Sequence, residues 1–86
     1  MEKEEQLLKQ GDDAEQLIKS DTFNNVVNSL VESTFQAFVN TKPEEGNNRE
    51  RTYNHYRALV DIVNTLQQRV SVRDEIMNKR NNSEEE

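Results

Sequence analysis

The residues that could transfer protons or bind a metal ion are few and lie far apart in this sequence. His55 is the only histidine, and the chain has no cysteine. The paired carboxylates Asp12–Asp13 and Glu44–Glu45 are expected in solvated caps or turns. Thiol catalysis and zinc sites require clustered cysteine, histidine or carboxylate ligands, and two glycines are too few for a phosphate-binding loop. We therefore predict no catalytic residues, no metal site, no cofactor and no small-molecule ligand, and hence no enzyme.

Aromatic and basic side chains gather in one short stretch and are the candidate partner-binding residues: Arg49, Arg51, Tyr53, Tyr56 and Arg57. Such clusters occur at protein interfaces and on nucleic-acid-binding surfaces. The alternative is that both tyrosines are half-buried packing residues of a hairpin, with their hydroxyls reaching water. A helix-turn-helix does not fit, because both major helices are too long and their connection contains Pro43 and two acids. Nucleic acid alone is therefore not expected to determine the function.

Two stripes of apolar residues at helical spacing must position these side chains. The first begins at Phe23 and repeats at intervals of three and four residues to Val39, which predicts a helix over 21–41. Ser20 or Asp21 can cap its start, and Pro43 disfavours helical backbone at the residue before it. The second stripe follows the alternating spacing of a coiled coil from Tyr56 to Val70. Val72, Ile76 and Met77 continue it in a shifted position, so a helix over 48–79 is predicted.

The connection between the two stripes has the composition of a turn. Gly46 permits a positive φ, and Asn47 with Glu50 resembles a capping box that opens the second long helix. A connection of about six residues makes the two helices antiparallel neighbours. Arg73 falls where the next apolar residue of the stripe would stand, and we expect it to interrupt the stripe.

The two ends of the chain are predicted to contain less regular helix than its middle. Gly11 interrupts an apolar face, and Asp12 with Glu15 resembles a capping box, so a short helix over 13–19 is favoured over one that spans 3–19. Whether the helix extends before Gly11, as a frayed segment, is left open. Residues 81–86 have nothing to bury, and we expect a disordered acidic tail there. The prediction is an all-α protein: one helical domain over 1–80, consisting of an antiparallel helical hairpin with an additional short N-terminal helix.

A single chain of this composition is expected to need a partner. The chain has 86 residues, 31% hydrophobic content and no cysteine for a disulfide. For such a chain, the free energy gained by burying apolar surface is nearly cancelled by the conformational entropy lost on folding. Both apolar stripes are wider than one hairpin requires, so we expect a homo-oligomer. The alternatives are a three-helix monomer, in which the first helix covers part of this surface, and an obligate complex with another protein. The candidate residues of the oligomer contact are Leu30, Phe38, Leu59, Val63, Leu66 and Val70.

Charge is unevenly distributed along the chain. The net charge is −6, yet all six arginines lie after residue 48 and most acids lie before it. The simpler interpretation is an acidic helix packed beside a basic one, and the alternative is a basic ridge offered to phosphate. No apolar run approaches the length of a membrane span, and the charged N-terminus is unlike a signal peptide. We expect a cytoplasmic protein without membrane contact.

Residues 11 to about 70 resemble a group of short α-helical proteins of tailed bacteriophages. The resemblance is carried by Gly11-x-x-Ala14-x-x-Leu17-Ile18-x-x-Asp21-x-Phe23, Leu30, Phe38-x-x-Thr41-x-Pro43, Arg49-Glu50-x-x-Tyr53, Leu59 and Leu66. It implies a phage setting, with a host-cytoplasmic or virion-associated location, and the hairpin core is similar in architecture to small terminase subunits.

Two functions follow as expectations. The first is a non-enzymatic, homo-oligomeric assembly or adaptor protein in virion morphogenesis, such as a small terminase subunit. The alternative is an early phage protein that binds and inhibits or redirects a host protein, either as an acidic mimic of nucleic acid or as a helix that docks in a groove.

Overall fold

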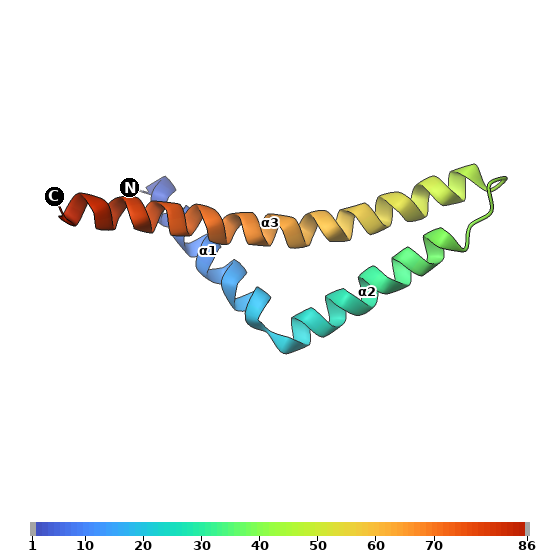
Figure 1. Ribbon diagram of the computed structural model, residues 1–86, viewed down its shortest axis with the longest axis horizontal. Coiled ribbons are helices and arrows are strands. Elements are labelled where there is room, and N and C mark those ends of the chain that lie inside the picture. The colour runs from blue at the N-terminus through green and yellow to red at the C-terminus, as the bar shows by residue number, and fades with distance from the viewer. Residues whose placement is uncertain (1, 86) are drawn as a thin grey trace. The chain divides into compact units, whose positions relative to one another are not determined.

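The computed structural model describes residues 2–85, and all of its regular structure in that range is helical (Figure 1). Helix α1 spans Glu2–Lys19, α2 spans Asp21–Val39 and α3 spans Gly46–Glu85. Ser20 alone separates α1 from α2, and residues 40–45 connect α2 to α3. The predicted all-α class is confirmed.

The described chain divides into two compact units, where the sequence predicted one domain over 1–80. The hairpin unit comprises residues 21–63, which are α2 and the first part of α3. The α1 unit comprises α1 and Ser20 with the part of α3 from residue 64 onward. This division follows from the length of α3, because α1 and α2 pair with different stretches of the same long helix.

Helix α1 begins at Glu2, so the longer of the two helices considered forms, and the favoured short helix over 13–19 is only its second part. Gly11 does not end the helix because it lies where α1 touches α3: a Cβ atom added there would collide with the Cβ of Arg73 and lie 2.9 Å from the carbonyl oxygen of Arg69. The predicted capping box is also wrong, since Asp12 and Glu15 are inside the helix and accept hydrogen bonds from Arg73.

The connection between α2 and α3 is built differently from the prediction. Helix α2 ends at Val39, and the amide and hydroxyl of Thr41 both donate to the carbonyl oxygen of Phe38 in the turn that follows. Helix α3 begins at Gly46, which has no positive φ. Glu45, rather than Asn47, joins the loop to the helix: its carboxylate accepts from the amide of Lys42 and the side chain of Asn48.

Helix α3 continues through residues 81–85, where the sequence predicted a disordered tail over 81–86; Glu86 lies outside the described residues. Extending an existing helix adds one hydrogen bond per residue without a new nucleation cost. No proline and no glycine follow Gly46 to interrupt that extension. The absence of apolar residues in this segment is therefore compatible with helix.

Candidate functional site

Two aromatic contacts fix the pairing of α2 with α3 in the hairpin unit. The rings of Phe35 and Tyr56 lie 5.9 Å apart, and those of Phe38 and Tyr53 lie 5.6 Å apart, both in tilted arrangements. Three residues forward along α2 correspond to three residues backward along α3, so the two helices are antiparallel. Tilted aromatic pairs at such distances are favourable beyond the area they bury.

Two of the five predicted partner-binding residues, Arg49 and Tyr56, take part in this packing and are half-buried. Tyr56 is half-buried against Phe35, and the Arg49 guanidinium lies 4.9 Å from the centre of the Phe38 ring, in the geometry of a cation–π contact. Arg57 forms an ion pair of 3.2 Å with Asp61, one turn further along α3.

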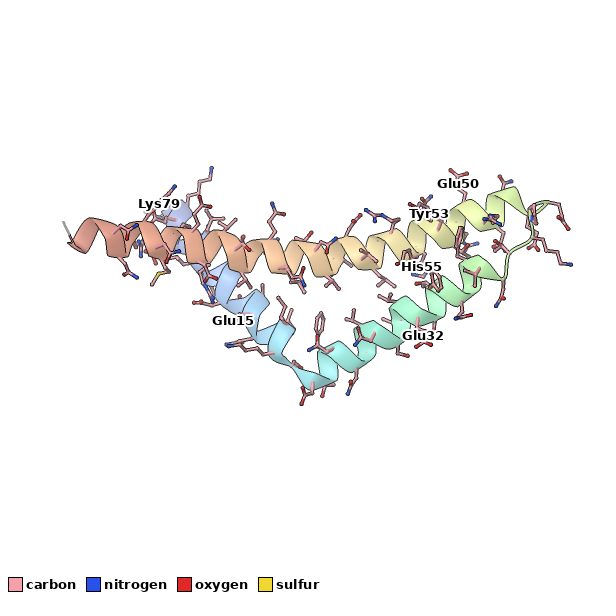
Figure 2. All side chains as sticks on the ribbon, viewed as in Figure 1. Glu15, Glu32, Glu50, Tyr53, His55 and Lys79 are labelled. Carbon is pink, nitrogen blue, oxygen red and sulfur yellow. The ribbon has the colours of Figure 1, made fainter. Side chains whose placement is uncertain are left out.

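The other three candidate residues remain exposed to solvent. Tyr53 is 45% exposed despite its ring contact, and Arg51 and Arg57 are exposed, as is His55. Figure 2 shows that Glu50 and Glu32 project from the outer surfaces of α3 and α2, away from the facing helix of the hairpin. The five candidate residues thus divide into two that are half-buried in the hairpin and three that stay exposed on α3, and their role in binding a partner stays a prediction.

The six residues predicted for the oligomer contact separate into three groups. Phe38, Leu59 and Val63 are half-buried in the hairpin unit, while Leu66 and Val70 are half-buried in the α1 unit. Leu30 differs from all of them, because it is 47% exposed on α2. Only Leu30 among the six therefore offers substantial apolar surface to a partner.

The α1 unit contains a charged contact that the sequence analysis missed. Arg73 lies with its side chain 14% exposed and donates to Asp12 at 2.9 Å and to both carboxylate oxygens of Glu15 at 3.1 and 3.2 Å. Its neighbour Asp74 accepts a further hydrogen bond at 2.9 Å. Arg73, expected to interrupt the apolar stripe, thus stays on the face of α3 that meets α1.

The same arrangement recurs one heptad further along. Arg80 donates to Glu4 at 2.7 Å and to Glu5 at 3.2 Å. Seven residues separate Arg80 from Arg73, and seven separate Asp12 from Glu5, which is the repeat of a coiled coil. The signal was present in the sequence, since Arg73 and Arg80 continue the heptad positions of Leu59 and Leu66.

These ion pairs shift the pKa of three groups: Glu15, Arg73 and Arg80. The hydrogen bonds from Arg73, followed by its charge, hold the pKa of Glu15 below its ordinary value of 4.5. Hydrogen bonds to Glu15, Asp74 and Asp12 raise the pKa of Arg73, and those to Glu4 and Glu5 raise the pKa of Arg80. Glu15, Arg73 and Arg80 are therefore charged at neutral pH.

The described residues bury little apolar surface. Ala14 is the one hydrophobic residue among them that is buried. The large apolar side chains with more than two fifths of their surface exposed are Leu17, Val26, Leu30, Phe35, Val39, Tyr53, Ile62 and Met77. Six of these eight belong to the hairpin unit, so the hairpin unit carries most of the exposed large apolar side chains that the structure describes.

Among the side chains of residues 2–82, no group of three or more histidine or acidic residues could hold a metal ion. No helix within residues 2–85 is long and apolar enough to cross a lipid bilayer. Comparisons with protein-family models, with curated proteins and with solved structures found no match to this chain.

Proposed function

We propose that this protein is a non-enzymatic helical adaptor that acts as a homo-oligomer in the assembly of a bacteriophage virion, for example as a small terminase subunit. One observation carries the proposal: a hairpin whose apolar side chains are mostly half-exposed, with no fully buried large side chain in the described part of the chain. The phage setting rests on the sequence pattern over residues 11 to about 70.

In this proposal, association buries apolar surface that the single chain leaves in contact with water. Each square ångström of apolar surface removed from water contributes about 25 cal/mol, and chains of this size have little stability to spare. Val26, Leu30 and Ile62 are about half exposed, so a second set of helices against them would bury surface that the hairpin leaves in water. The exposed apolar surface thus favours a protein that works by binding other copies.

The oligomeric state tests the first part of the proposal. Light scattering after size-exclusion chromatography is expected to give a multiple of the 10.1 kDa chain mass at micromolar concentration. The melting temperature should rise with protein concentration, because association stabilises the folded state by mass action. A mass of one chain with a concentration-independent melting temperature would contradict the proposal.

The position of the gene in its genome tests separately whether the protein belongs to a phage assembly pathway. For an assembly adaptor, the gene is expected among the capsid and terminase genes of a phage, and the protein should be found with assembling particles. A gene transcribed early, whose product is retained by a host protein in salt that screens charge attraction, would instead favour the host-directed alternative.

A further inference from the structure

The contact between α1 and α3 in the α1 unit is complete without α2. Gly11 lies against Arg73, and Glu4, seven residues earlier, pairs with Arg80, seven residues later. The two helices are therefore antiparallel. Both interactions join α1 to the part of α3 from residue 64 onward, and neither involves α2. The α1 helix of any other copy of the chain could consequently make the same contact in full.

Charge and small side chains, more than apolar burial, keep α1 on α3. The buried residues of α1 are Gly11 and Ala14, both small. The Arg73 guanidinium is largely covered by its ion pairs with Asp12 and Glu15. Ion pairs at a protein surface contribute little stability each, and no large side chain among the described residues is fully buried. Helix α1 can therefore leave α3 without disrupting a large apolar core.

The covalent connections make α1 easier to exchange between chains than α2. Residues 40–45 alone join α2 to α3, and such a short connection keeps that pairing within one chain. Asp12 and Arg73 are instead 61 residues apart in sequence. The advantage of a contact within one chain falls with the length of the loop that it closes. Since Ser20 alone separates α1 from α2, a backbone change at this residue redirects the whole helix.

We propose that α1 of one chain docks on α3 of a second copy, and that α1 of the second copy docks on α3 of the first in return. Exchange of an identical element gives a closed two-fold dimer without any new contact surface. This inference rests on the proposed homo-oligomeric function and names its contact. It also assigns a place in that contact to Leu66 and Val70, which lie in the part of α3 that receives α1.

Charge selects α1 as the helix of the second copy that binds here. At both ion-pair positions α1 contributes carboxylates, and α3 contributes Arg73 and Arg80. A second α3 would bring arginine against arginine, and like charges across a contact oppose binding. The acidic residues of α2 are Asp21 and Glu32, which do not have the seven-residue spacing of the two arginines. The opposite charges at the matching spacing are those of α1.

Charge reversal divided between two chains tests the exchange. One variant carries Arg80→Glu, and the other, with an affinity tag, carries Glu4→Arg and Glu5→Arg. Each alone has like charges at this position, whereas an exchanged dimer of the two has opposite charges at both of its contacts. After the two are unfolded and refolded together, we expect a heterodimer of twice the 10.1 kDa chain mass in excess of either homodimer. Its melting temperature should exceed that of either variant alone.

The matched control uses an ion pair that lies within α3 alone. Lys79 and Glu75 are 3.9 Å apart, one turn from each other on the same helix. Mixing Lys79→Glu with Glu75→Lys is expected to give only the statistical share of heterodimer and no rise in melting temperature. Exchange of α1 does not bring these two side chains together between chains.

A cross-link tests the exchange should the charge-reversed variants fail to fold. Leu8 and Met77 line the same small cavity of the α1 unit. The natural chain has no cysteine, so a thiol cross-linker can join a tagged Leu8→Cys variant to a Met77→Cys variant only between two chains. This mixed product is expected to exceed the self-linked product of either variant. Leu8→Cys mixed with Glu75→Cys, at an exposed position of α3, is the control.

The outcomes separate the exchange from the proposed function. A natural chain that forms oligomers, combined with charge-reversed variants that show no excess of heterodimer, would overturn the exchange and leave the homo-oligomer standing. Equal cross-linking of Leu8→Cys to Met77→Cys and to Glu75→Cys would likewise overturn it. A natural chain that is monomeric at every concentration would remove both proposals.

Discussion

Two glycines in this chain have opposite roles, although both lie in helices. Gly11 is buried where α1 meets α3, and the backbone of α3 near Arg69 and Arg73 leaves no space for a side chain. Gly46 lies in the first turn of α3, with an ordinary φ and no neighbouring atom within 4 Å of an added Cβ. One glycine is required by packing, and the other is not.

Substituting each glycine by alanine should therefore change stability in opposite directions. Gly11→Ala gains up to about 1 kcal/mol of helix propensity, but the forced separation of α1 from α3 costs about 1–3 kcal/mol, so a net loss is expected. Gly46→Ala should raise the stability by about 0.4–1 kcal/mol. Thermal unfolding followed by circular dichroism measures both, and a stabilised Gly11→Ala would show that the close contact does not exist in solution.

At the scale of elements, α1 and α2 are held to α3 by different interactions. The hairpin unit uses aromatic pairs and half-buried aliphatic residues. The α1 unit uses the small residues Gly11 and Ala14 for close approach and arginine–carboxylate pairs on either side. The α1 contact should consequently respond to pH more strongly than the hairpin does.

The direction of that pH response follows from Glu15. Its pKa in the folded chain lies below its ordinary value of 4.5, so its contribution to stability is complete above that value and is lost as the pH falls through the folded pKa. Acid titration followed by amide hydrogen exchange is expected to release α1 before α2. Glu15→Gln should flatten the acid dependence of α1 protection, and an unchanged profile in that variant would argue against the Arg73 pair in solution.

At the scale of the whole molecule, one leucine contributes to the fold of the single chain and another is exposed and free to contribute to association. Leu59 is half-buried in the hairpin contact, whereas Leu30 is 47% exposed on α2. The two residues therefore distinguish loss of the hairpin from loss of an oligomer.

Leu30→Asp is expected to dissociate the protein while leaving its helicity nearly intact, because a carboxylate at an exposed position of the single chain stays hydrated. Leu59→Asp should reduce helicity, since an unpaired carboxylate would enter the contact between α2 and α3. Sedimentation measures the first effect and circular dichroism the second. Equal loss of helicity in both variants would mean that Leu30 belongs to the folding core.

The sequence by itself determined the helical class, the breaks near residues 20 and 40–45 and the presence of apolar faces, because periodicity and turn residues act locally. It did not predict the start of α1, because Gly11 is tolerated only through its contact with α3. The tertiary structure alone decided that Asp12 and Glu15 bind Arg73 instead of capping a helix, and that Tyr56 and Arg49 pack inside the hairpin while Leu30 stays exposed. These contacts join residues that lie far apart in the sequence. The local spacing of residues along one helix does not determine which distant residues come together.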